Sequence, residues 1–198
     1  MACDNFLWFP NGAQGGMLNQ GTSARPQGET QDDWMSKMQA LEVKSFSFGA
    51  TMPHTTGSMT SGSSGGKIGF NEFSISKYVD LASVPVFSAA TVGAHFPFVF
   101  LAVRKAGGIH LLYLQFLFAQ VFVVGIDWSG GSGDEPFTEN IKFRYGAMGI
   151  QYIKQDATGQ ADSKTPPQQA LWSAITNEPK VIVPGLPTPP QFIGISQA

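Results

Sequence analysis

The segments 96–104 (FPFVFLAVR) and 111–126 (LLYLQFLFAQVFVVGI) decide the fold of this chain. Apolar side chains occupy both alternating sets of positions in each segment. Because successive side chains of a strand point to opposite faces of a sheet, such strands must be buried on both faces. The pair Gly107-Gly108 between them is typical of a tight turn. The two segments therefore predict a buried pair of antiparallel strands.

Something must cover the second face of these strands, because one face of an antiparallel sheet is normally solvated. Only the segment 83–93 has convincing helix signals, with Ser83 as a cap and Gly93 closing the helix. We therefore expect a second subunit to supply the cover, the alternative being the chain's own helices. The subunit interface is then expected at Phe98, Phe100, Leu114 and Phe116.

Shorter apolar runs complete the sheet. They predict strands at 4–9, 41–49, 68–75, 137–145 and 148–154. A helical turn is expected within 32–40, capped by Asp32 or Asp33. Between Val43 and Phe46 the apolar positions change phase, which indicates a bulge or a transfer between two packing surfaces. The expected fold class is mainly β, a small antiparallel β-barrel with one short flanking α-helix.

Composition narrows the classes of function. The chain has 198 residues, of which only 13% are charged, and its net charge is −2. It lacks the basic excess of a nucleic-acid-binding protein. Its longest apolar stretch, 111–126, is shorter than the roughly 20 residues of a membrane helix, so no membrane insertion is expected. Oligomerisation is the expected way to cover a surface that is so poor in charge.

The N-terminus and the cysteine content bear on the compartment. Cys3 is the only cysteine, so no intrachain disulfide can form, as expected for a chain that folds in a reducing cytosol. The N-terminal stretch carries an acid where a signal peptide has basic residues, and its apolar run is short. We expect the chain to have no signal peptide and to avoid the general secretory route if it leaves the cell.

Two segments stand apart from the predicted sheet. Residues 51–66 form a tract rich in Ser, Thr, Gly and Met, and a loop of this length inside a compact domain is usually functional. The segment 161–198 is a C-terminal extension that ends in a Pro-rich tail. The expected organisation is one β domain over 1–160, followed by this extension.

Little in the sequence points to catalysis. Residues 62–66 (GSSGG) match the G-x-S-x-G pattern of a hydrolase nucleophile, but they lie in a Ser/Gly tract where chance matches are expected. The histidines His54, His95 and His110 have no His or Cys partner at metal-ligand spacing. We therefore expect no enzyme, no catalytic residue, no cofactor and no metal. The enzymatic alternative is a serine hydrolase that acts through Ser64.

Several segments occur in the order known from one protein family. They are 4–7 (DNFL), 28–30 (GET), 41–49 (LEVKSFSFG), 66–68 (GKI), 73–80 (FSISKYVD), 89–95 (AATVGAH), 103–108 (VRKAGG), 113–114 (YL), 136–143 (PFTENIKF) and 152–159 (YIKQDATG). This ordered set resembles the hemolysin-coregulated protein (Hcp) family of bacterial type VI secretion systems, most sharply at VRKAGG. The stretch 11–28 is longer than in the family, and the tail after about residue 176 has no recognised counterpart.

The resemblance implies a function as well as a fold. Hcp proteins form hexameric rings that stack into a tube, which a contractile sheath drives out of the cell with a spike protein at the tip. Family rings also hold small effector proteins in the lumen. The resemblance thus implies a protein that is cytoplasmic when assembled and then secreted. The tail tube protein of a phage or of another contractile injection machine is the alternative, with a similar fold.

The expected contacts can be assigned to residues. Ser45 and Ser47 alternate with Phe46 and Phe48, so the two serines share one face, which is expected either to line the lumen and contact effectors or simply to face solvent. The loop 51–66 is long enough to reach a neighbouring subunit or ring. Its expected contact residues are Met52, His54, Met59 and Ser61.

Overall fold

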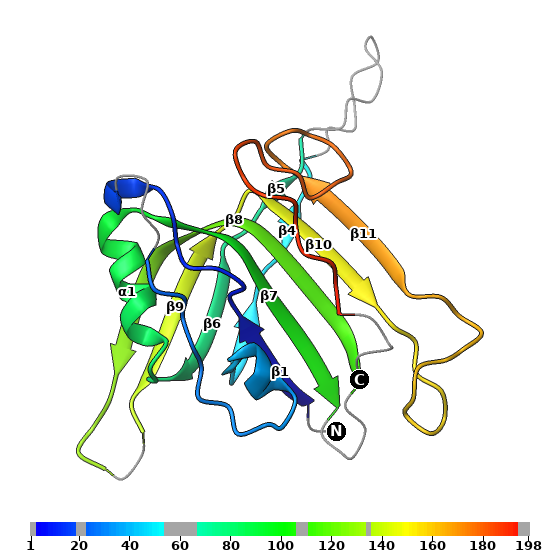
Figure 1. Cartoon of the computed structure of the whole chain (residues 1–198), viewed down its shortest axis with the longest axis horizontal. Coiled ribbons are helices and arrows are strands. Elements are labelled where there is room, and N and C mark those ends of the chain that lie inside the picture. Colours follow the sequence, from blue (N-terminus) through cyan, green and yellow to red (C-terminus); the bar gives the residue numbers. More distant parts are fainter. Residues whose placement is uncertain (1–2, 19–22, 54–66, 106–110, 134–135, 194–198) are drawn as a thin grey trace.

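The computed structural model describes residues 3–18, 23–53, 67–105, 111–133 and 136–193. Within these ranges, nine strands form one antiparallel sheet with a single α-helix, α1 (Ser83–Val92), against it (Figure 1). The strands are β1 (Cys3–Trp8), β2 (Leu41–Glu42), β3 (Ser45–Ser47), β4 (Ala50–Thr51), β5 (Gly69–Phe70), β6 (Phe73–Tyr78), β7 (His95–Lys105), β8 (Leu112–Ser129), β9 (Thr138–Arg144), β10 (Ala147–Tyr152) and β11 (Gln168–Ser173). Two 3-10 turns, η1 (Gly16–Leu18) and η2 (Met35–Met38), complete the described elements.

Strand β8 organises the sheet. One of its edges pairs with β7, as the two doubly apolar segments predicted. Its other edge pairs first with β10, over residues 114–119, and then with β9, over residues 122–129. Gln120, between the two pairings, has a positive φ of 51°, and Gly146 separates the partner strands. The sheet therefore branches here, with β11 beyond β10 and with β6 and β3 beyond β9.

The two ends of the strand order, β2 and β3, are consecutive in the sequence. Between them the Val43 N–H donates to Asn5 O of β1 at 2.9 Å, and the Lys44 N–H donates to Ser76 O of β6 at 2.8 Å. The chain thus passes from one edge of the sheet to the other, at the predicted change of phase. Because β2 and β3 lie end to end, they cannot pair side by side. The expected closed barrel is therefore corrected to an open, branched sheet within the described residues.

The main core lies on one face of this sheet and is rich in phenylalanine. Phe73 of β6 stacks on Phe118 of β8 with ring centroids 4.4 Å apart. Helix α1 closes this core with Val86 and Ala89. Aromatic pairs of this geometry stabilise a fold beyond the area that they bury.

The second face of β7 and β8 is also covered, and the chain itself supplies the cover. Phe98 and Phe100 are buried in a second cluster with Met35 of η2. Val181 and Val183, from the Pro-rich segment, complete this cluster. A second subunit is therefore not needed to bury Phe98 and Phe100. The expectation that a second subunit covers these strands is corrected at Phe98 and Phe100.

The helix predicted over 83–93 is confirmed, with one correction at its start. Gly93 closes it in the left-handed conformation, with a φ of 66°. Ser83 does not cap it; instead Asp80 Oδ1 accepts the Ala82 N–H at 3.0 Å. The helical turn expected within 32–40 is the 3-10 turn η2. Asp32 caps it by accepting the N–H of Met35 at 2.9 Å.

Candidate functional site

A strip of small polar side chains runs across β3 and β6. Ser45 lies opposite Ser76, and Ser47 lies opposite Ser74. The alternate residues of both strands, such as Phe46 and Ile75, pack on the main core. Because side chains alternate across a strand, the serines lie on the opposite, solvent-facing side. Both predicted luminal residues are exposed and belong to this serine strip.

The serine strip continues across β9 into longer polar side chains. Asn140 pairs with Ser76, and Lys142 pairs with Ser74. Lys142 Nζ lies 3.3 Å from Asp127 Oδ2 of β8, in an exposed ion pair. This face therefore offers hydroxyl and amide groups, flanked by charges that are already paired. It can hydrogen bond to a polar surface, but it has no group poised for covalent chemistry.

A buried ion pair supports the strip from the core side. Lys77 of β6 lies directly opposite Glu139 of β9, and Lys77 Nζ is 2.8 Å from Glu139 Oε1. Asp80 Oδ1 lies 2.6 Å from the same Nζ, and the Ser83 hydroxyl donates to Glu139 Oε1 at 2.6 Å. The other carboxylate oxygen of Glu139 accepts the Trp128 indole N–H at 3.0 Å. These contacts fix β6, β8, β9 and the start of α1 relative to one another.

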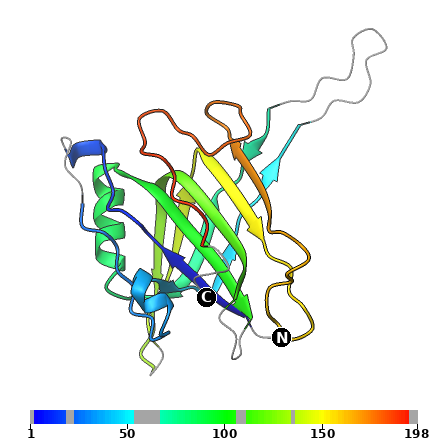
Figure 2. The same cartoon turned by 45° about the vertical axis from the view of Figure 1, so that its right-hand side comes forward.

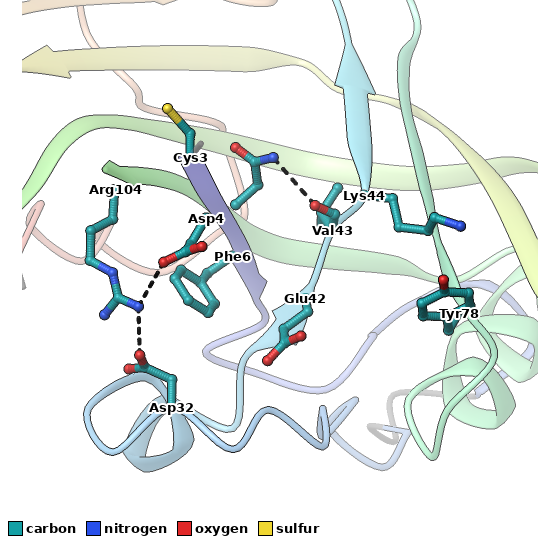
Figure 3. Close-up of a pocket in the computed structure, with 10 residues that line it drawn as sticks. Cys3, Asp4, Phe6, Asp32, Glu42, Val43, Lys44, Tyr78 and Arg104 are labelled. Carbon is teal, nitrogen blue, oxygen red and sulfur yellow. Dashed lines mark hydrogen bonds and ion pairs between the residues drawn. The ribbon is translucent and has the colours of Figure 1, made fainter. Parts of the chain in front are cut away.

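A polar cavity of about 470 Å³ lies where β1, β2, β6 and β7 meet (Figure 3). Arg104 Nη2 donates to Asp32 Oδ2 at 2.6 Å and to Asp4 Oδ2 at 3.0 Å. Lys44, with its ammonium group 4.2 Å from the Tyr78 ring centroid, lies on the other side of the cavity. The arrangement ties the start of β1 and the turn before η2 to β7, so we assign it a structural role.

The electrostatics of this cavity follow from the same contacts. Burial alone would raise the pKa of Asp32, but the hydrogen bonds from Arg104 and from the backbone of Met35 lower it below its ordinary value. Burial would lower the pKa of Arg104, whereas its hydrogen bonds to Asp32 and Asp4 raise it. Both groups are therefore held in their charged forms.

The residues predicted to contact a neighbouring subunit or ring fall mostly outside the described part of the chain. His54, Met59 and Ser61 lie there, as does the G-x-S-x-G match at 62–66. Met52 is described and is 56% exposed. It follows β4, which pairs with β5 in a small sheet of its own that stands out from the main sheet (Figure 2).

The predicted interface strands divide between the two cores. Phe98 and Phe100 lie in the second cluster, and Phe116 is buried in the main core. Leu114 is only partly buried. These four residues therefore form no common surface.

Two histidines remain as candidates for chemistry. His95 starts β7, burial lowers its pKa, and its ring packs on Phe122 at 5.2 Å. His110 is outside the described residues. The residues placed by the structure include no group of three or more His, Cys, Asp or Glu side chains that could hold a metal ion. Across these same ranges, no helix is both long and apolar enough to span a membrane.

Sequence reasoning missed an exposed apolar patch beside α1. Phe87 and Trp128 are 47% and 53% exposed, and their ring centroids lie 5.5 Å apart. Val84, one turn before Phe87 on α1, is also exposed. We call these three residues the α1 patch. The hydrogen bond to Glu139 fixes the Trp128 indole, so the patch presents an ordered aromatic surface to solvent.

Comparison with known proteins places the chain in a family. The family described as "Type VI secretion system effector, Hcp" matches residues 17–152, which is more than half of the chain. The chain therefore belongs to the Hcp family, the tube proteins of type VI secretion systems. The resemblance inferred from the ordered motifs is thereby confirmed.

Individual relatives agree with this assignment. The Hcp1 protein of Pseudomonas aeruginosa is 30% identical over 97 residues, and the match spans 48% of this chain and about 60% of that relative. A solved structure of a type six secretion system protein is 30% identical, with a TM-score of 0.72 over 89% of this chain and 99% of the other. Hcp1 from Salmonella typhimurium has the same fold, with a TM-score of 0.64 at 24% identity, over 90% of this chain and 99% of the other.

Proposed function

We propose that this chain is a structural subunit of the type VI inner tube, which closes into hexameric rings and stacks into a tube. The contractile sheath, the spike protein at the tip and small effector proteins are its proposed partners. It assembles in the cytoplasm and is then secreted. The observation that carries the proposal is the serine strip, a solvent-facing polar surface on the strands that match the family.

The strip suits the wall of a channel. Ser45 and Ser47, with Ser74 and Ser76, are small and uncharged, so they leave a channel open and form only weak hydrogen bonds with cargo. A large apolar or unpaired charged surface would hold a passing protein too tightly. The lumen is therefore assigned to this face of β3, β6 and β9.

The ring contact needs an apolar surface that the chain itself leaves uncovered. The α1 patch meets this requirement, whereas Phe98 and Phe100 do not. A head-to-tail contact closes into a ring when its rotation divides the circle. Ordered aromatic side chains commonly provide most of the binding energy of such interfaces. We assign the α1 patch to the contact with the next subunit of the ring.

The contact between stacked rings is assigned to the β4–β5 pair and the loop 51–66. Met52 is the described residue of that loop with a large exposed apolar side chain. A pair of strands that stands apart from the main sheet can reach a second ring without rearranging the first (Figure 2). The proposed inter-ring residues remain Met52, His54, Met59 and Ser61.

Substituting Ser47 with a bulky residue tests the luminal assignment. Ser47→Trp should remove copurifying effector proteins and leave rings intact in electron micrographs, because the indole enters the channel without touching a subunit contact. Ser163→Trp, at an exposed serine in the turn after β10, is the matched control. Equal effector copurification by both variants would contradict the luminal assignment.

A further inference from the structure

The described part of the C-terminal segment, residues 178–193, lies across the face of β8 and β10 (Figures 1 and 2). We call it the strap. It lies outside the stretch 17–152 that matches the Hcp family. The proposed tube function gives the strap no role.

Apolar side chains hold the strap at both ends. Val181 and Val183 are buried to 3% and 5% exposure. Phe192 meets Phe100 edge to face, with ring centroids 6.3 Å apart. These side chains join the second cluster, where Leu117 of β8 is buried beneath them. The strap therefore fills an apolar groove on this face.

A buried amide clamps the end of the strap. The Gln115 side chain of β8 is fully buried, and its amide nitrogen donates to Ile193 O at 2.9 Å. Its amide oxygen accepts the Ile193 N–H at 3.1 Å. The second amide hydrogen goes to Gln151 Oε1 of β10 at 3.0 Å. The Gln115 side-chain amide, which we call the clamp, thus hydrogen bonds to both backbone groups of Ile193, as a neighbouring strand would. All hydrogen-bonding groups of this amide are used.

The strap is nevertheless not a strand of the sheet. Within the described residues, its other backbone hydrogen bonds are local or reach only Ser173, next to the strap, through Glu178 O. Five prolines from Pro179 onward restrict its backbone, which lowers the entropy lost on docking, and a turn in which the Leu186 N–H donates to Val183 O at 3.1 Å folds it back on itself. A segment held by side chains and one amide can detach without breaking a ladder of the sheet.

The groove has room for a chain segment because of a glycine. A methyl group added at Gly149 of β10 would lie 2.6 Å from Leu171 Cδ2 and 3.2 Å from the Phe192 ring. The absence of a side chain at this position lets the strap approach the strand closely. The groove therefore combines an aromatic contact, a close backbone approach and an amide that binds a peptide backbone, which together recognise an apolar peptide segment.

We propose that this groove is a peptide-docking site and that the strap is its exchangeable ligand. The strap opens as a unit while the sheet stays folded, and the vacated groove accepts the strap of a second copy of this chain. The occupant is the strap, residues 178–193, because within one chain these residues already bind the Gln115 amide, contact the Phe100 ring and fill the groove. Gln115 is the residue that positions the peptide.

Binding of a fluorescein-labelled peptide of residues 178–193 to the full-length chain tests the proposal. In the wild-type chain the resident strap competes at an effective concentration on the order of millimolar, so little peptide binds. Phe192→Ala weakens the resident strap but leaves the groove intact, and it should strengthen peptide binding about tenfold or more. Gln115→Ala also loosens the resident strap, but it removes the clamp that the added peptide needs. Binding of the labelled peptide should therefore stay at the wild-type level. Ile182→Ala, on the exposed side of the strap, is the control and should match the wild type.

Two outcomes would overturn the proposal: no gain in binding by folded Phe192→Ala, or an equal gain by Gln115→Ala. If Phe192→Ala does not fold, Ile193→Pro provides the same test, because it removes the N–H that the clamp accepts, together with the Ile193 side chain, and leaves every residue of the groove unchanged. Hydrogen exchange gives a second readout. The Ile193 amide, which donates to the clamp, should exchange faster than the hydrogen-bonded amides of β8, and equal rates would contradict opening of the strap. Micrographs of rings report separately on the tube function.

Discussion

Lys77 Nζ of β6 lies 2.8 Å from Glu139 Oε1 of β9, and water reaches neither side chain appreciably. The two residues are direct cross-strand partners on the core side of the sheet. A charge in such a place is tolerated only when it is paired and hydrogen bonded. Here Asp80, Ser83 and Trp128 complete the set of partners.

Lys77→Met should lower the free energy of unfolding by about 3 kcal/mol, because it leaves the Glu139 carboxylate buried without its cation. Urea denaturation of the purified chain measures this change. The matched control is Arg144→Ala, which breaks the exposed pair with Glu72 and should cost less than about 1 kcal/mol. Similar losses for both variants would contradict the structural role of the buried pair.

Asp32 should make folding sensitive to acid. Its folded pKa lies below the ordinary value of 3.8, so its contribution is fully present above that value and is lost as the pH falls through the folded pKa. Asp32→Asn keeps the cap of η2 but removes the charge. Its free energy of unfolding should therefore fall less than that of the wild type between about pH 6 and pH 3. The neighbouring Asp33→Asn is the control, and an unchanged slope for Asp32→Asn would refute the assignment.

Gly149→Ala should destabilise the chain by about 1–3 kcal/mol, the usual effect of overpacking. The added methyl group would lie 2.6 Å from Leu171 Cδ2, so β11 or the strap must shift. Gly131→Ala is the matched control, since a methyl group there meets nothing within 4 Å. Thermal or urea denaturation compares the two, and equal stabilities would show that the groove over β10 is less tightly packed than described.

Much of the sheet could be predicted from the way side chains alternate between the two faces of a strand. The doubly apolar segments 96–104 and 111–126 became β7 and β8, because no other arrangement buries both faces. What covers them could not be predicted. Val181 and Val183 lie in a Pro-rich segment whose composition is that of an exposed tail, and only the three-dimensional structure shows that they fold back over Phe100.

The buried ion pair could have been inferred from the alternation of buried and exposed positions along β6 and β9. Lys77 is in phase with Phe73 and Ile75, and Glu139 is in phase with Ile141. Two opposite charges at core positions of two strands indicate a buried pair. Gln115 within an apolar run is a similar signal, but its partner is 78 positions away in the sequence and could not be inferred.

The serine strip extends the luminal prediction to a second strand. Ser45 and Ser47 could be placed on one face from the sequence, but their partner Ser74 required the strand register. Ser74→Trp should therefore reduce effector copurification as Ser47→Trp does, with rings intact. If effectors still copurify with Ser74→Trp, Ser74 does not share the luminal role of Ser47, and the lumen is restricted to β3.

The α1 patch should be required for ring closure. Phe87→Glu places a charge beside Trp128 in the proposed subunit contact, so rings should give way to monomers in size-exclusion chromatography. The circular dichroism spectrum should be unchanged, because Phe87 is 47% exposed in the single chain. Ile182→Glu, equally exposed on the strap, is the control and should leave rings intact. Rings formed by Phe87→Glu would exclude the α1 patch as the contact.

Cryo-electron microscopy of the purified full-length chain tests the tube assignment most directly. The tube assignment predicts hexameric rings or stacked tubes, with Ser45 and Ser47 of the serine strip facing an open central channel. Particles that remain monomeric at high protein concentration would contradict it, as would rings in which the serine strip lies on the outer surface.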